Sequence, residues 1–440
     1  MSLDIILEKA SAFESAIQDR HLIEGLVLPT LVLPDLGEAD FQTGNYENCA
    51  IWTGEYVAAQ SLRFAVTGDP QAKIKAKNSL TALHKLQTIT NGDELVARGF
   101  KLRDERSWDE LFFWIKEGKN LGQSKLRDEY DFSKGNRAKV YDTLFGYRRN
   151  NEWHQAGPYR WLGDASNSQV FGVLFGYFAF HRYCNPTADE MEFIKKDVAN
   201  IVNKLLDNNM QIVGKDKKRT TYGSNRRFFG YGVGPAITLS EIKLAHHITG
   251  EERFQTEYYR QLEKCMHSGS INPRRPEFGP LKYTHSNLGS DDNLTMLNYD
   301  MFMSLEDNNE VLESCRRGLR ERWLAINDPQ NPLFNFIYHA LLGQKSPALQ
   351  QGIDALDDFP TNKVVNAVAL KRTLPICQQL RDVLTHTKMP LQERPVDEYA
   401  WRVNPYRHDK WVAVLPGKME FTGIDFLIAA NYGLYHNLIS

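Results

Sequence analysis

Long apolar runs with helical spacing alternate along this chain with runs that carry charge on one side. The clearest example is the run 49–66, which is almost uncharged apart from Glu55 and Arg63 and is followed by a polar break and the charged run 71–87. A helix that is apolar on all sides is buried, whereas an amphipathic helix lies half exposed. Pro70 suits the first turn of the second helix, because its missing N–H would have no helical partner there. The pattern predicts a hairpin of one inner and one outer helix.

The same alternation continues to the end of the chain. Further inner helices are predicted at 164–183, 234–248, 292–305, 334–342 and 423–438, and further outer helices at 187–208, 252–266, 309–324 and 347–356. The last inner run has no helix after it, and the first helical run, 3–18, is an outer helix without a partner. Six inner runs with six outer partners, the last pair joining the chain ends, predict one all-α domain over 1–440, an (α/α)6 toroid. An irregular helical protein or an open solenoid is the alternative.

Two segments depart from this alternation. The segment 101–149 is long, charged and aromatic, and we expect it to form an insertion over one rim of the toroid. The segment 210–222 is typical of a short β-hairpin, with Gly214, Lys215 and Asp216 as its turn.

Composition narrows the classes of function. Of the 440 residues, 42% are hydrophobic and 25% charged, and the formal net charge of -2 does not supply the basic surface that attracts nucleic acid. No apolar run approaches the roughly 20 residues that cross a bilayer, and the N-terminal run carries charges, so we expect no signal peptide and a cytoplasmic location. The cysteines are odd in number and contain no Cys-x-x-Cys pair, which favours buried reduced thiols at Cys49, Cys184, Cys265, Cys315 and Cys377.

In a toroid of this kind, the loops that enter the inner helices gather at one mouth, where unpaired backbone N–H groups favour anionic or hydroxyl-rich ligands. The predicted entry loops combine aromatic rings with hydrogen-bonding side chains: Asn45, Trp52, His154, Trp161, Tyr222, Arg226, Arg227, His285, Tyr338, Trp401, Arg402 and Arg407. Rings cover the apolar face of a pyranose, and polar groups bind its hydroxyls. Any one of these rings more often packs in a core, but their gathering predicts an oligosaccharide site. The arginines either clamp a uronate or sulfate or pair with nearby acids.

Several segments resemble the six-hairpin glycosidase-like superfamily, and specifically a bacterial group within it. They are 52–59, 66–70, 163–166, 290–294, 331–338, 401–407 and 423–427. The resemblance implies a toroid and a carbohydrate-active enzyme, but the superfamily includes hydrolases, lyases, epimerases and phosphorylases, so it does not choose a reaction. Where the group has an acidic pair after Gly163-Asp164-x-Ser, this chain has Asn167, Ser168 and Gln169.

Hydrolysis of a glycoside needs one carboxylic acid to protonate the leaving oxygen and a second carboxylate as base or nucleophile. At the predicted mouth we expect Asp164 to be the acid and Glu47 or Asp292 the base, with Asp40, Asp291 and Glu420 behind them. Asp164, Asp291 and Asp292 also lie at the starts of predicted helices, so each could instead cap a helix N-terminus.

Two other functions fit the same residues. A lyase would neutralise a uronate with Arg226 or Arg402 and remove a proton with His285, His154 or Tyr222. A protein that binds a glycan or a partner without turnover would need no acidic pair. Nothing in the sequence implies a cofactor or a metal, since it contains no Walker phosphate loop and no His-Glu-x-x-His motif.

Overall fold

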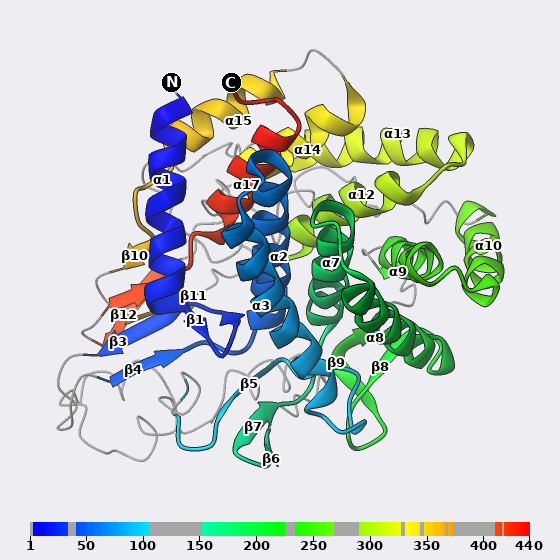
Figure 1. The fold of residues 1–440 in the computed structure, drawn as a ribbon, viewed down its shortest axis with the longest axis horizontal. Helices are drawn as coiled ribbons and strands as arrows, with labels where there is room; N and C mark the ends of the chain where they lie inside the picture. Colours follow the sequence, from blue (N-terminus) through cyan, green and yellow to red (C-terminus); the bar gives the residue numbers. More distant parts are fainter. Residues whose placement is uncertain are drawn as a thin grey trace.

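The fold is taken from a computed structural model of the chain. The structure describes residues 3–33, 41–105, 107, 152–224, 234–267, 290–326, 331–343, 347–365, 368–372, 410–415 and 418–440. Within these ranges it is mainly helical, as the alternation of apolar and amphipathic runs predicts (Figure 1). Most of the predicted insertion 101–149 lies outside the described residues.

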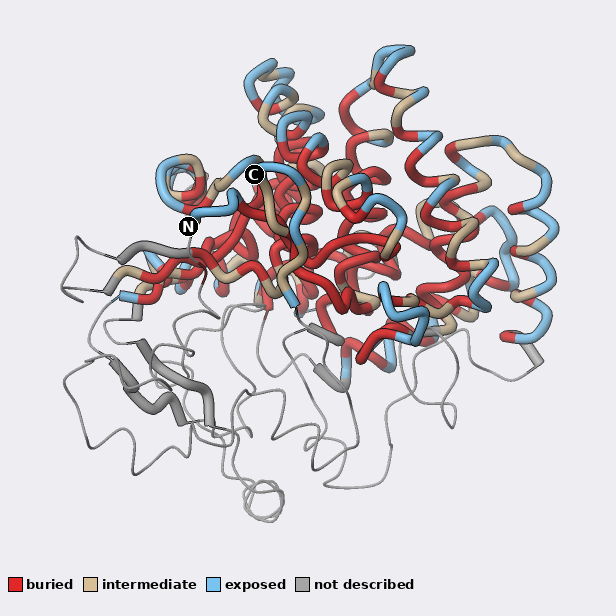
Figure 2. The backbone as a smooth tube through the Cα atoms, turned by 90° about the horizontal axis from the view of Figure 1, so that it is seen from below, coloured by how far each residue is buried: buried red, intermediate tan, exposed pale blue. Residues whose placement is uncertain are grey.

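The predicted inner helices are present, with bounds close to those expected. They are α2 (Cys49–Thr67), α7 (Asn167–Tyr183), α9 (Gly234–Thr249), α12 (Ser290–Leu305), α14 (Pro332–Leu342) and α17 (Ile424–Tyr435). Each contacts the next one in this order, and α17 also contacts α2. Buried residues concentrate in the interior of the molecule (Figure 2), and many of them belong to these helices. Helices α2 and α7 approach most closely, because a Cβ on Gly54 would lie 2.0 Å from the carbonyl oxygen of Gly172.

The predicted outer helices are also present: α1 (Leu3–Ala16), α3 (Pro70–Thr88), α8 (Ala188–Asp207), α10 (Glu252–His267), α13 (Asn309–Ile326) and α15 (Ala348–Asp357). Each of α3, α8, α10, α13 and α15 contacts the inner helix that precedes it in the chain. Their N-termini are built as the sequence indicates. The Asp69 carboxylate accepts from the N–H of Gln71 ahead of α3, and Thr187 and Glu190 form a capping box at α8.

The first and last helices of the chain lie side by side (Figure 1). The rings of Phe13 on α1 and Phe426 on α17 have centroids 5.3 Å apart. Glu14 on α1 accepts a hydrogen bond of 2.9 Å from the Tyr56 hydroxyl on α2. A single turn of π-helix, η1 (Ile17–His21), follows α1. The N-terminal outer helix therefore packs on the C-terminal inner helix, which has no helix after it.

Small antiparallel sheets lie near the end of the molecule where α2 and α7 begin (Figure 1). Three sheets have two strands each: β1 (Leu22–Ile23) with β2 (Leu26–Val27), β11 (Val368–Arg372) with β12 (Lys410–Leu415), and β8 (Gln211–Val213) with β9 (Arg219–Ser224). A three-stranded sheet has the order β5 (Gly99–Leu102), β7 (Tyr159–Leu162), β6 (Trp153–Ala156). A four-stranded sheet has the order β10 (Val364–Val365), β13 (Lys418–Glu420), β3 (Thr30–Leu33), β4 (Phe41–Gly44). The β8–β9 hairpin confirms the prediction for 210–222, and the Gly214 N–H closes its turn by donating to the carbonyl of Lys218 at 2.8 Å. The sequence analysis predicted none of the other strands.

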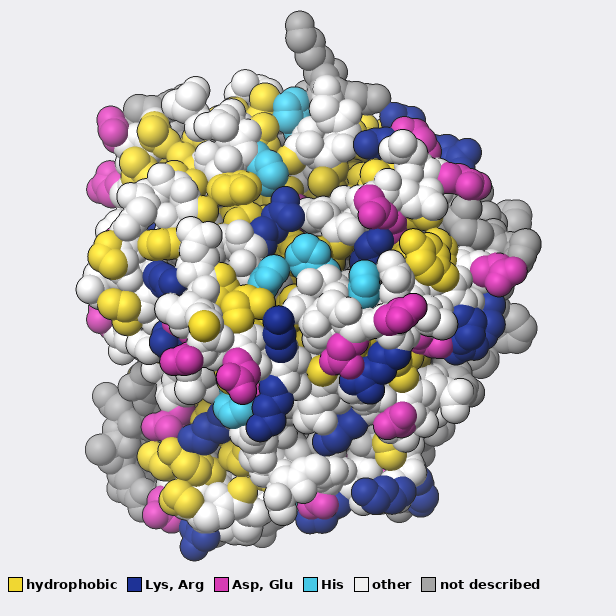
Figure 3. All heavy atoms as spheres, turned by 45° about the vertical axis from the view of Figure 1, so that its right-hand side comes forward, with side chains coloured by type: hydrophobic (Ala, Val, Ile, Leu, Met, Phe, Trp, Pro, Cys, Tyr) yellow, Lys and Arg dark blue, Asp and Glu magenta, His cyan; other side chains and the backbone are white. Residues whose placement is uncertain are grey.

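The surface and core agree with the composition in several respects. Cys49, Cys184, Cys265 and Cys315 are buried free thiols, as predicted, and Cys377 lies outside the described residues. On the face shown in Figure 3, basic and acidic side chains are interspersed among the described residues. The described part of the chain contains no helix with the length and apolar character needed to cross a membrane.

Candidate functional site

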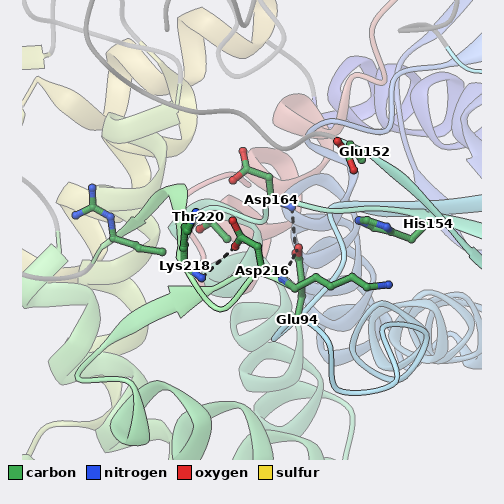
Figure 4. Close-up of a pocket in the computed structure, with 10 residues that line it drawn as sticks. Glu94, Glu152, His154, Asp164, Asp216, Lys218 and Thr220 are labelled. Atoms are coloured by element: carbon green, nitrogen blue, oxygen red, sulfur yellow. Dashed lines mark hydrogen bonds between the residues drawn. The ribbon is translucent and has the colours of Figure 1, made fainter.

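A cavity of roughly 590 Å³ opens beside the start of α7 (Figure 4). Three parts of the chain line it: the turn after α3, the segment around β6 and β7, and the β8–β9 hairpin. The lining residues are Glu94, Glu152, His154, Asp164, Gly214, Lys215, Asp216, Lys218, Arg219 and Thr220. Several ionisable groups thus meet in one hollow, which is the usual composition of an active site.

Asp164 is held in an unusual backbone conformation at the wall of this cavity. Its φ of 62° lies in the left-handed region, which residues other than glycine rarely adopt. Its N–H donates to Glu94 Oε2 at 3.0 Å, its carbonyl accepts from Arg98 Nε at 2.6 Å, and its Oδ1 accepts from the Thr221 N–H at 2.7 Å. Neighbouring segments therefore determine both the backbone and the side chain of Asp164.

The helix that follows does not use Asp164 as its cap. Ser166 is the N-cap of α7, and the Gln169 side chain completes a capping box with it. This chain departs from the resembled bacterial group at Asn167, Ser168 and Gln169. These residues form the first turn of α7, and Gln169 stabilises its start through the capping box. Asp164, two residues earlier, remains a side chain of the cavity.

Glu94 is another of the carboxylic acid residues that line the cavity, and the sequence analysis did not predict it. Its side chain is 5% exposed and accepts hydrogen bonds from the backbone N–H groups of Asp164 and, at 3.4 Å, Lys215. Burial, assisted by the negative charge of Asp164, raises the pKa of Glu94 to about 7. Such a carboxyl group is protonated in about half of the molecules at neutral pH, which suits an acid or base catalyst.

His154 on β6 lies close to Glu94. A Cβ on Gly163 would lie 3.0 Å from Glu94 Oε1 and 3.1 Å from His154 Nε2, so these two atoms flank the same glycine. Burial lowers the pKa of His154, and the charge of Lys215 lowers it further. His154 is therefore a neutral imidazole near pH 7. Its ring packs on Trp161, whose centroid is 4.3 Å away and whose side chain is buried.

Arg98 links Glu47 to Asp164 in the structure, and the sequence analysis did not predict this role of Arg98. The buried guanidinium of Arg98 donates to the Glu47 carbonyl at 3.2 Å as well as to the Asp164 carbonyl. Asn45 Oδ1 accepts from the Glu47 N–H at 3.0 Å. Glu47 and Asn45 thus lie in the entry segment next to that of Asp164, but neither is among the residues that line the cavity.

Other predicted site residues lie in packed surroundings. Asp292 is fully buried in the first turn of α12 and forms an ion pair with Arg322. Trp52 is part of the core, and Tyr338 stacks on Trp323 with centroids 4.2 Å apart. Tyr222, by contrast, is not packed in the core: it is exposed on β9, next to Thr221.

Glu420, predicted to lie behind the main carboxylates, contacts the N-terminal segment instead. It forms an ion pair of 2.7 Å with Arg20. Burial alone would raise its pKa, but the neighbouring His21 ring and the hydrogen bonds from Arg20 outweigh that effect and lower the pKa of Glu420 to about 2. The remaining candidates lie outside the described residues, or their side chains do: Asp40, Arg226, Arg227, His285, Asp291, Trp401, Arg402 and Arg407.

Among the described residues, no group of three or more His, Cys, Asp or Glu side chains has the arrangement of a metal site.

Comparisons with known proteins add little to this description. No family model matches the chain, and no curated protein matches it. Two chains of known structure match, and one of them is a glycoside hydrolase family 76 mannosidase from Bacteroides thetaiotaomicron VPI-5482. The match covers 80% of this chain and 96% of that one, with 13% sequence identity and a TM-score of 0.29. At that TM-score, the function of the cavity has to follow from its own residues.

Proposed function

We propose that this protein is a carbohydrate-active enzyme that hydrolyses an oligosaccharide with a pair of carboxyl groups, Glu94 and Asp164. The observation that carries the proposal is the Glu94 carboxyl group, which is buried in the wall of a cavity beside a second carboxylate and has a pKa of about 7. A glycosidase needs one such acid and one ionised partner.

We further propose that the helices form a closed (α/α)6 toroid with this cavity at its mouth. The support is the cyclic order of contacts among α2, α7, α9, α12, α14 and α17, together with the packing of α1 on α17. The cavity lies where the chain enters α7, which fits the expectation that entry segments gather at one mouth.

The sequence predicted Asp164 as the acid with Glu47 or Asp292 as the base, but the environment of Glu94 favours Glu94 as the acid and Asp164 as the base. Protonated Glu94 donates its proton to the glycosidic oxygen as the bond from that oxygen to the anomeric carbon breaks. Asp164 accepts a proton from water, whose oxygen then bonds to the anomeric carbon. Both Asp164 Oδ1 and Glu94 accept backbone hydrogen bonds, so their positions are fixed before the substrate arrives.

A sugar also fits the other groups near the cavity. The neutral His154 can accept a hydrogen bond from a hydroxyl group, and Glu152 can accept another. The exposed ring of Tyr222 on β9 and the half-buried ring of Trp153 on β6 come from strands that line the cavity or adjoin it. Aromatic faces of this kind pack against pyranose rings.

The test is turnover of a panel of oligosaccharides, followed by the release of reducing ends. Glu94→Gln and Asp164→Asn should each lower kcat by about 10²- to 10⁴-fold, the usual contribution of an acid–base group. Asparagine tolerates the left-handed backbone at position 164, so folding should be retained. Glu192→Gln, on the exposed surface of α8, is the matched control and should leave turnover unchanged. Full activity of both cavity variants would refute the assignment.

The same panel examines a lyase, which the neutral imidazole of His154 favours as an alternative, because a neutral histidine can remove a proton next to a uronate carboxylate. Ultraviolet absorbance of an unsaturated uronate product would show elimination instead of hydrolysis. A thermal shift with no product from any member of the panel would favour a glycan-binding protein without turnover.

A further inference from the structure

The β8–β9 hairpin brings a concentration of positive charge to the cavity. Lys215, Lys218 and Arg219 all line it, whereas Lys217 in the same turn does not. Lys215 is paired with the Asp93 carboxylate at 3.1 Å. Among the described residues, no carboxylate forms an ion pair with the side chain of Lys218 or Arg219. Two cationic side chains at a cavity wall without partner carboxylates attract a negatively charged group.

We infer that the sugar bound in this cavity carries a carboxylate or sulfate group, and that Lys218 and Arg219 bind that group. The inference rests on the proposed function and names its substrate class. Arg219 supplies a planar pair of donors that matches an oxyanion, and Lys218 supplies a second cation from the adjacent position.

The hairpin that carries these cations also positions both reacting carboxyl groups. The Lys215 N–H donates to Glu94, and the Thr221 N–H donates to Asp164. Lys218 and Arg219 lie between these two donors in the sequence. An anionic substituent held by Lys218 and Arg219 therefore lies on the same short hairpin that fixes the carboxyl pair, which makes the hairpin a positioning element for the substrate.

The turn is fixed well enough to hold this geometry. The Gly214 N–H donates to the Lys218 carbonyl at 2.8 Å, and the Lys218 N–H donates to Asp216 Oδ1 at 3.0 Å. The backbone on both sides of Lys218 is thus restrained, while the exposed side chain remains available to a ligand.

The acidic side chains of the cavity restrict where an anion can bind. Figure 4 shows Lys218 and Thr220 on one side of Glu94, and His154 and Glu152 on the other. On the His154 side, the cation Lys215 is already paired with Asp93, and Glu152 adds a negative charge that disfavours an anion there. Lys218 and His154 thus lie on opposite sides of Glu94.

Calorimetric binding with two matched pairs of probes tests the inference. The first pair is trigalacturonate and its fully methyl-esterified form, and the second is 6-sulfated N-acetylglucosamine and N-acetylglucosamine. Wild-type protein should bind the charged member of at least one pair roughly tenfold more tightly, the usual effect of one charge-assisted contact. The pair that shows the preference distinguishes a carboxylate from a sulfate.

The variants Lys218→Gln and Arg219→Gln should each reduce this preference several-fold, and the double variant should abolish it. Lys217→Asn is the charge-matched control, because Lys217 has a φ of 62°, which asparagine tolerates, and does not line the cavity. It should keep the full preference. No preference in the wild type, or an unchanged preference in the double variant with an unaltered Tm, would overturn the inference.

The two proposals fail separately. Tight binding of a charged sugar without any cleavage product would contradict the proposed hydrolysis and still support the anion site. Cleavage of neutral oligosaccharides alone, unaffected by the double variant, would support hydrolysis and contradict the anion site.

Discussion

Glu94 and Glu55 are both buried acids, yet they lie in very different surroundings. Glu94 lines a cavity and accepts backbone hydrogen bonds from loop residues. Glu55 lies inside α2, where its Oε1 accepts a 2.5 Å hydrogen bond from Asn293 on α12. Burial, with a further contribution from Asp425, raises the pKa of Glu55 to about 8. A raised pKa is therefore common to both, and access to a cavity is what distinguishes a candidate catalyst from a protonated core residue.

The cluster around Glu55 also contains an ion pair in the core. The Lys363 ammonium lies 2.8 Å from the Asp425 carboxylate at the start of α17, and both side chains are almost completely buried. Near the cavity, the pair of Lys215 with Asp93 is about half exposed. The two pairs allow the comparison to be tested by matched substitutions.

The largest expected effect is on stability. Lys363→Met should lower the free energy of unfolding by about 3–5 kcal/mol, because it leaves the Asp425 carboxylate buried without its partner. Lys215→Met removes a lysine from an exposed pair and should change the same quantity by about 0–1 kcal/mol. Urea unfolding of both variants measures the difference, and equal losses would contradict the distinction between the two clusters.

The next effect concerns activity and pH. If Glu94 is the acid, kcat/KM should fall as the pH rises through about 7, because the carboxyl group must carry its proton to donate it. Glu94→Gln should remove this basic limb along with most of the rate. The pH profile of kcat/KM for Glu55→Gln should match that of the wild type. Loss of the basic limb in that variant would show that Glu55, and not Glu94, is the group whose titration limits activity.

The last prediction concerns the pH dependence of stability due to Glu55. Its folded pKa lies above its unfolded value, so its contribution is fully present below about pH 4.5 and is lost as the pH rises through about 8. Glu55→Gln should flatten this part of the curve, since glutamine resembles the protonated acid. Its stability should match that of the wild type near pH 4.5 and exceed it increasingly as the pH rises toward 8. Chemical unfolding between pH 4.5 and 9 measures this difference, and parallel curves for wild type and variant would exclude the shift.

The helices could be predicted because their signal is local. Runs such as 49–66 and 187–208 display their apolar period over several turns, and Asp69, Thr187 and Asn331 mark their starts with side chains that accept from the first N–H groups. The β8–β9 hairpin was predicted for the same reason, since its turn lies in neighbouring residues. The strands that pair across long distances, such as β3 with β13, have only three or four residues each and no local signal.

The residues of the candidate site also differ in whether a local sequence signal could identify them. The sequence placed Asp164, His154 and Glu47 near one mouth, because each precedes or enters a predicted inner helix. It did not single out Glu94, which lies in an ordinary turn after α3, or Arg98, which looks like a surface charge. Their importance comes from burial beneath β7 and the hairpin, and no pattern near residue 94 encodes that burial.

The sequence alone determined the helical hairpins, the turn at 214–216 and the absence of a strong charge, since each depends on neighbouring residues or on composition. The tertiary structure decided which carboxyl groups share a cavity, which one carries a raised pKa and which cations face it. Those properties depend on removal from water and on distances between segments far apart in the chain, and both arise only when the segments pack together.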